Sequence, residues 1–345
     1  MTPTNNIAPA AQTVTAGRKL YSHFNLPPLL TYILRRVGIG LVLTLFVSIL
    51  LFGATQLLPG DAATAILGRA AADPGAVQYL RQQLGLNHSA VYQYVLWFRH
   101  FVSGNLGISY AAREQVTTLI RARVVNTLIL AGVTLAIMIP LSVVLGTVAG
   151  IRRGRRVDNA ISGFTLGAIA LPEFVSGTLL VLLFAVLLRM LPAVSLINGG
   201  SNPLSSPNIL VLPVVTLLIS GMAYNVRMIR AGVADVMASD YVESARLNGI
   251  PEGRIVRHHV LRNALAPSVQ TLAMTVQWLV GGVVVVETVF QYPGIGQALV
   301  QAVSTRDIPV VQALGMLIAL IYIFVNILAD VAVVLLIPKL RTEAR

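Results

Sequence analysis

Long apolar runs, each nearly free of charged residues, constrain this chain more than any other feature of its sequence. A helix needs about 20 apolar residues to cross the hydrocarbon core of a bilayer. The fourth run is the shortest, whereas the third and sixth are long enough to tilt or to project beyond the lipid. The sequence therefore predicts an all-α polytopic membrane protein with about six transmembrane helices. We expect these spans at 37–57, at 125–150, within 161–188, and at 209–224, 266–290 and 310–337.

The distribution of basic residues sets the expected orientation of the spans. With both termini in the cytoplasm, 17 of the 25 Lys and Arg residues fall in cytoplasmic segments, which agrees with the positive-inside rule. The net charge of +12 is therefore mostly a topology signal with some attraction to membrane lipid, and no nucleic-acid partner is expected. The chain has no cysteine, which excludes disulfides and thiolate metal sites.

The segments between the spans complete the expected organisation. Ser89 is the expected N-cap of a helix of about three turns that stops at Gly104. It is too short to span, so we expect it at the membrane surface or packed on the spans, either as a lid or in a docking role. Val77, Leu80 and Leu84 indicate another external helix.

The expected segments are a flexible tail at 1–30, a first transmembrane helix at 31–57, an external helical segment at 58–123, a core with five transmembrane helices at 124–337 that includes a cytoplasmic loop at 227–265, and a tail at 338–345.

A second external loop, at 287–312, has strong turn signals. Pro293, Gly294 and Gly296 force a turn, and the sequence GQALVQAV then predicts a short helix that ends near Arg306 and Asp307. We interpret this loop as a compact element over a pore mouth, with an ordinary connector as the alternative.

A charged stretch at 241–267 separates two apolar runs. Asp240 or Ser239 can cap a helix, and Glu243 stands at capping-box spacing from Asp240. Gly249 supplies a left-handed stop after about two turns, and Pro251 suits the first turn of a second helix. Because a free two-turn helix is not stable in water, this one needs a partner surface on its own chain or on another protein.

The stretches ESARLNG and HHVLRNALAP resemble the cytoplasmic loop of the inner-membrane permeases of binding-protein-dependent ABC importers. Glu243, Ala245 and Gly249 match the Glu-Ala-Ala…Gly motif of that loop, and Ser244 departs from it by one hydroxyl. Arg262 after Leu261 departs from the general Leu-Pro ending and is similar to the peptide/nickel branch. The stretches LPGDAA, LRQQLGLN, GNLGIS, RRGRRVDN, LPEFVSG and VETVFQYPGIGQALVQAVSTRDIPVVQ extend the resemblance to the B-type subunit of dipeptide/oligopeptide permeases over about 31–337.

The resemblance implies a function and an assembly. It implies a permease subunit of an ATP-driven importer in the bacterial inner membrane, working by alternating access, with peptides as the first substrate class and nickel or another small solute as variants. Its partners would be a second related permease, two cytoplasmic ATPase subunits and an external solute-binding protein. The implied ATPase-coupling residues are Asp240, Glu243, Ser244, Ala245, Arg246 and Gly249.

Missing motifs limit the chemistry of the chain itself. The sequence has no GxxxxGK[ST] motif and no HExxH motif, so we expect no enzyme activity and no bound cofactor, and ATP and Mg²⁺ would act in the partner ATPases. His258 and His259 are adjacent and point apart on a helix, so they make no chelating pair alone. Two classes of protein are rivals to an importer subunit: a stand-alone secondary carrier or channel, and an intramembrane enzyme.

Acidic residues inside or near the spans are candidates for the transport route, because such groups are costly in lipid. For Glu287 and Asp330, hydrogen bonding to neighbouring helices is favoured over lining the route or locking a gate, whereas for Glu173, beside Pro172, both readings stay open. No basic partner stands out in the spans, which argues against proton coupling. The candidate pathway or gate residues are Glu173, Glu287, Tyr292, Arg306 and Asp307.

Overall fold

The computed structural model describes residues 28–57, 62–67, 73–83, 85–197 and 202–336. Within these ranges the chain is helical and forms no named strand, which confirms the all-α prediction. The predicted tails fall almost wholly outside the described residues, as does Leu84. The α-helices are α1 Pro28–Gln56, α2 Ala62–Leu67, α3 Pro74–Gln83, α4 Ala90–Val102, α5 Val116–Ile151, α6 Arg156–Ala170, α7 Glu173–Leu180, α8 Asn208–Met237, α9 Asp240–Leu247, α10 Glu252–Arg254, α11 Leu261–Val289, α12 Ile295–Ser304 and α13 Ile308–Leu336, with π-helical turns at Val181–Leu187 and Ile255–Val260 and a 3₁₀ turn at Pro203–Ser205.

Among the described residues, five helices are long and apolar enough to cross a membrane, and a bent pair makes a sixth if it counts as one span. The third predicted span, within 161–188, is sharply bent, because α6 and α7 meet at an angle of 109°. Pro172 explains the bend: it disfavours helical dihedrals at the preceding residue, and Leu171 is extended at φ −97° and ψ 121°. The clearly apolar stretches of the five helices are Leu30–Gln56, Val116–Ile151, Asn208–Met237, Ser268–Val289 and Ile308–Val334.

The helix α8 is the centre of the bundle. Its predicted span, at 209–224, is the shortest of the six, but α8 continues to Met237. The start of the predicted loop at 227–265 is therefore helix. In its most apolar window 72% of the residues are buried. Gly146 and Gly150 of α5 allow a close approach, since a Cβ at either would lie 2.7 Å from Ile229 or Val233 of α8. This is the small-residue packing of membrane helices.

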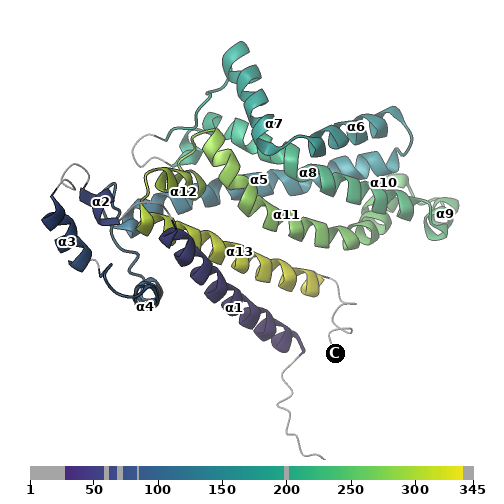
Figure 1. Cartoon of the computed structure of the whole chain (residues 1–345). Coiled ribbons are helices and arrows are strands. Elements are labelled where there is room, and N and C mark those ends of the chain that lie inside the picture. The colour runs from purple at the N-terminus through teal and green to yellow at the C-terminus, as the bar shows by residue number, and fades with distance from the viewer. Residues whose placement is uncertain (1–27, 58–61, 68–72, 84, 198–201, 337–345) are drawn as a thin grey trace, which may run out of the picture.

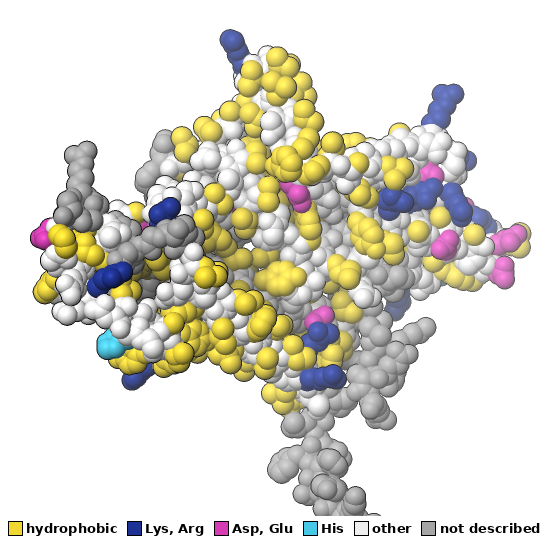
Figure 2. Space-filling view, in the orientation of Figure 1, with side chains coloured by type: hydrophobic (Ala, Val, Ile, Leu, Met, Phe, Trp, Pro, Cys, Tyr) yellow, Lys and Arg dark blue, Asp and Glu magenta, His cyan; other side chains and the backbone are white. Residues whose placement is uncertain are grey.

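The pair α1 and α13 lies at the periphery, side by side (Figure 1). Only 17% of the apolar window of α1 and 11% of that of α13 are buried, and Figure 2 shows hydrophobic side chains over this region. Arg36 of α1 pairs with Asp330 of α13 at 2.9 Å. The favoured interpretation of Asp330, a bond to a neighbouring helix, is therefore confirmed. Its basic partner lies just before the first predicted span, at 37–57.

The two ends of the bundle differ in composition. The α9 end carries α9 and α10, and Figure 2 shows basic side chains gathered there. The α12 end carries α12 and, beside it, the helices α2–α4 (Figure 1). Two predictions for this end are confirmed: the N–H of Tyr92 donates to the Ser89 hydroxyl at the start of α4, and Gly104 after its end has φ +81°.

Candidate functional site

The helix α9 is attached to the bundle by two apolar side chains. Val242 and Ala245 are three residues apart, on one face of the helix, and are 0% and 9% exposed. They belong to an apolar cluster with Val233 of α8 and with Ile255 and Val260 of the π-helical turn. Burial of this face supplies the partner surface that an isolated two-turn helix lacks.

The opposite face of α9 is open. Glu243, Ser244 and Arg246 are exposed, and Leu247 is 83% exposed. Leu247 is thus a single large apolar side chain among polar groups on this exposed face. The Arg246 guanidinium also reaches the Glu252 carboxylate at 2.6 Å across the turn that follows.

The ends of α9 agree in part with the sequence. The helix begins at Asp240, and Ser239 is the N-cap residue without a side-chain capping bond. The Ser239 hydroxyl donates to the Val236 carbonyl. The predicted capping box of Asp240 with Glu243 is therefore wrong, since Asp240 already lies inside the helix. Gly249 ends the segment with φ +76° as predicted, and no atom lies within 4 Å of the position of its missing Cβ. Backbone conformation, rather than space, thus selects glycine here.

Sequence reasoning missed an ion pair that connects α6 to α8. Arg230 of α8 donates through Nε and Nη2 to the Asp158 carboxylate of α6, which is 1% exposed. The Gly154 N–H and the Ser162 hydroxyl complete its hydrogen bonds at 2.8 and 3.2 Å. The partners are 72 residues apart, so no local spacing could have revealed them.

At the α12 end, the side chain of Glu287 is buried, and its carboxylate accepts several hydrogen bonds. Its carboxylate accepts from the Thr127 hydroxyl at 2.5 Å and from the N–H groups of Gly296 and Gln297 at 2.7 and 3.3 Å. These two N–H groups belong to the first turn of α12, so the carboxylate caps that helix. A Cβ on Gly294 would lie 1.9 Å from a carboxylate oxygen. Hydrogen bonding to neighbouring helices, the favoured reading for Glu287, is confirmed.

Asp307 ties the chain before α5 to the start of α13. Its carboxylate accepts from the Ser109 hydroxyl and from the N–H groups of Tyr110 and Ala111, at 3.0 and 3.2 Å for the latter two. Burial and the nearby Asp307 charge raise the pKa of Tyr110 to about 12. Arg306, by contrast, is exposed and has φ 57°.

Tyr292 and Glu173 complete the predicted gate residues. The Tyr292 ring is buried, its hydroxyl donates to the Asn126 carbonyl at 2.8 Å, and burial raises its pKa. Glu173 is half-buried in the first turn of α7, where a carboxylate is favoured by the helix dipole. The structure thus brings Glu287 and Tyr292 together around α5, whereas Glu173 lies apart on α7 and Asp307 in a second network.

The order of these features agrees with two families of membrane proteins. Residues 142–342 match the binding-protein-dependent transport system inner membrane component, and residues 29–131 match the N-terminal family of such membrane components. The chain belongs to the binding-protein-dependent transport permeases. The match is to a membrane permease subunit of ABC transporters, a family that is not itself catalytic.

Relatives align with the permease over nearly their whole length. A probable peptide ABC transporter permease of Sinorhizobium fredii is 34% identical over 312 residues, which is 90% of this chain and 99% of the relative. A putative peptide permease of Brucella suis is 35% identical over 318 residues, covering 91% and 99%. The glutathione transport system permease GsiC of Escherichia coli is 35% identical over 314 residues, covering 91% and 99%.

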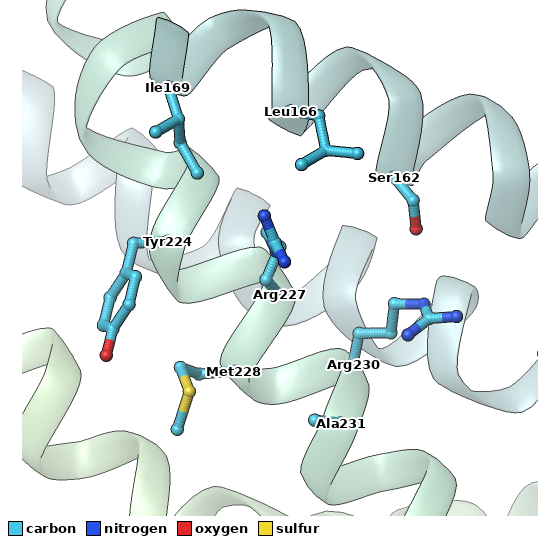
Figure 3. Close-up of a pocket in the computed structure, with 8 residues that line it drawn as sticks. All are labelled: Ser162, Leu166, Ile169, Tyr224, Arg227, Met228, Arg230 and Ala231. Atoms are coloured by element: carbon cyan, nitrogen blue, oxygen red, sulfur yellow. The ribbon is translucent and has the colours of Figure 1, made fainter.

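The permease also has a groove of about 550 Å³ between α6 and α8. Figure 3 shows Arg227 and Arg230 leaving α8 in different directions, with Leu166 and Ile169 of α6 above them. Arg230 is held by Asp158, whereas Arg227 is exposed and forms no ion pair with a described residue. The groove therefore has mainly apolar walls and one available guanidinium.

Proposed function

We propose that this permease is the membrane subunit of an ATP-driven peptide importer, and that α9 is the coupling helix that receives the movement of a partner ATPase. The relatives named as peptide and glutathione permeases support the substrate class. The observation that carries the coupling role is the division of α9 into a buried face, Val242 and Ala245, and an open face that includes Leu247.

The contacts of α9 offer a route for movement into the spans. The buried face of α9 packs against α8 and against the π-helical turn that leads into α11. Arg230 connects α8 to α6 through Asp158. When partner ATPases close on ATP, a displacement of α9 would act on α8 and α11 directly and on α6 through the ion pair. Such a displacement fits alternating access of a two-state bundle.

Other partners complete the assembly that we propose. A second, related permease would cover the side of α11 that carries Gln270, Met274 and Gln277, which follow at helical spacing. Gln270 and Met274 are exposed and Gln277 is half-buried, and amide groups on a span favour a protein or water contact over lipid. Two ATPase subunits would bind ATP and Mg²⁺, and an external binding protein would deliver the peptide. The permease would lie in an inner membrane with both of its termini in the cytoplasm.

The substitution Leu247→Asp tests the coupling role. Leu247 is 83% exposed, so the change should leave the fold intact while placing a charge in the ATPase contact. Loss of an interface anchor costs about 2 kcal/mol, or roughly thirtyfold in affinity. We therefore expect the ATPase pair to be lost on purification in mild detergent and peptide uptake to fall.

Leu204→Asp is the matched control, because Leu204 is also exposed, at 53%, but lies in the 3₁₀ turn before α8. It should leave the ATPase pair bound. Normal co-purification and uptake with Leu247→Asp at normal protein levels would overturn the coupling role of α9. Uptake that persists without any ATPase would instead support a stand-alone carrier, and uptake of nickel or another small solute in place of peptides would correct the substrate class.

A further inference from the structure

The helix α4 presents an apolar face that no described part of the chain covers. Val91, Val95 and Val102 follow at helical spacing, so they lie on one side of the helix. Their exposed fractions are 73%, 57% and 70%, and α4 has no fully buried residue. Three large apolar side chains on one side are costly in water, because burial of apolar surface is favourable.

Another side of α4 packs on α1 through aromatic rings. The rings of Tyr94 and Trp97 have centroids 5.5 and 5.7 Å from that of Phe52. The Tyr94 hydroxyl is 2.8 Å from the Ser48 hydroxyl. These contacts fix which side of α4 faces the bundle, and they leave the valine side free.

The contacts also fix the depth of α4. Ser48 and Gln56, which contact α4, are eight residues apart, or about 12 Å along the axis of α1. Since the apolar stretch of α1 ends at Gln56, α4 lies beside the last two turns of a span. Phe46 and Ile49 of the same part of α1 are 57% and 52% exposed. The helix α4 therefore lies beside a part of α1 whose apolar side chains are exposed.

The composition of α4 suits the boundary between lipid and water. Trp and Tyr are enriched at that boundary, and α4 contains Tyr92, Tyr94 and Trp97. Arg99 and His100 are exposed. Arg99 follows Val95 by four residues, so it borders the valine side, and its long basic side chain can reach lipid headgroups. We propose that α4 is an interfacial helix whose valine side, Val91, Val95 and Val102, contacts the acyl chains of membrane phospholipid and holds the segment after α1 at the bilayer surface.

The absence of cysteine in the native sequence allows a direct test by site-directed spin labelling. Val91→Cys, Val95→Cys and Val102→Cys are small changes on the proposed lipid side, and His100→Cys and Ser103→Cys are matched controls on exposed polar positions. Each variant is purified with its co-purifying partners, reconstituted in phospholipid nanodiscs, labelled and compared with the labelled cysteine-free permease complex. The measurement is the collision rate of the nitroxide with O₂, which enriches in lipid, and with a water-soluble nickel chelate.

We expect the ratio of O₂ to nickel collisions at the three valine positions to be several times the ratio at positions 100 and 103. Equal ratios at all five positions would overturn the proposal, because the valine side would then be no closer to lipid than the polar positions. Low collision rates with both reagents at 91, 95 and 102 would also overturn it, since a protein partner would then cover the face. Peptide uptake by the same variants reports separately on the proposed import function.

Discussion

The two ends of the bundle hold their helices in opposite ways. At the α12 end, the buried carboxylates of Glu287 and Asp307 accept hydrogen bonds from backbone N–H groups of neighbouring segments. At the α9 end, the buried contacts of α9 are apolar, through Val242 and Ala245. Its polar groups are exposed, including the hydrogen bond from Asn263 Nδ2 to the Tyr241 hydroxyl at 3.1 Å. Buried hydrogen bonds to a carboxylate are directional and costly to break, whereas apolar contacts are non-directional.

The difference indicates which end is built to keep its shape. The carboxylate of Glu287 fixes the position of α12 against α5 through Thr127, so any displacement of α12 loses several hydrogen bonds at once. The helix α9 can shift on its apolar base with a smaller penalty, because dispersion contacts re-form over small displacements. A coupling element has to transmit movement, which is the role that we propose for α9.

Glu287→Ala is the change with the largest expected effect on this comparison. It leaves the Thr127 hydroxyl and the N–H groups of Gly296 and Gln297 without their acceptor, and unsatisfied buried groups cost about 1–3 kcal/mol each. We expect a loss of about 3 kcal/mol or more in unfolding free energy, measured by thermal unfolding of the purified permease.

Glu287→Gln is the matched variant, because it keeps the size of the side chain and one carbonyl acceptor. It should lose less stability than the alanine variant. Glu114→Ala is an exposed-acid control and should change little. If Glu287→Ala unfolds at the same temperature as the native permease, the claim that this carboxylate holds the α12 end is wrong.

Gly249→Ala has an intermediate expected effect and acts at the other end. Its φ of +76° costs a residue with a Cβ about 1 kcal/mol or somewhat more, although the site has room for the methyl group. We expect overall unfolding to change little and peptide uptake to fall severalfold, because the end of α9 would no longer be held in its docking geometry.

Gly253→Ala provides the control for Gly249→Ala. Gly253 lies in α10, close to α9, and its missing Cβ also meets no atom within 4 Å. Unlike Gly249, it is not one of the described glycines with a positive φ. Uptake should be normal with this variant. Equal uptake by both variants would show that the left-handed stop has no part in coupling.

Local signals in the sequence predicted the elements whose causes are local. Ser89 and Gly104 fixed the ends of α4, and Gly249 fixed the end of α9, because capping and left-handed turns depend on a few adjacent residues. The capping box at Asp240 was wrong by one residue, since Ser239 and Asp240 compete for the same role and the pattern fits either.

The same local signals could not predict contacts between segments that are distant in the sequence. The apolar run of α8 was the shortest of the six, so apolarity alone could not predict that this helix lies at the centre. The burial of α8 depends on the close approach that Gly146 and Gly150 of α5 allow. Neither partner in the pairs Arg230–Asp158 and Arg36–Asp330 carries a local pattern that names the other. The apolar runs predicted the order of the spans, and the family resemblance implied a coupling loop. The geometry of these ion pairs could be seen only in the folded structure.

Arg246→Ala has the smallest expected effect and sharpens the comparison between the ends. Its guanidinium pairs with Glu252 at 2.6 Å, but the two side chains are 41% and 59% exposed. Exposed ion pairs contribute about 0–1 kcal/mol because water and salt screen them. We therefore expect Arg246→Ala to change the unfolding free energy by less than about 0.5 kcal/mol, far below the change for Glu287→Ala. Glu252→Ala and the double variant complete a cycle that isolates the pair, and a coupling energy above about 1 kcal/mol in that cycle would show that α9 is held by more than its apolar base. A drop in ATPase co-purification with Arg246→Ala but not with Glu252→Ala would place the guanidinium in the docking face, since loss of the pair alone cannot separate the two variants.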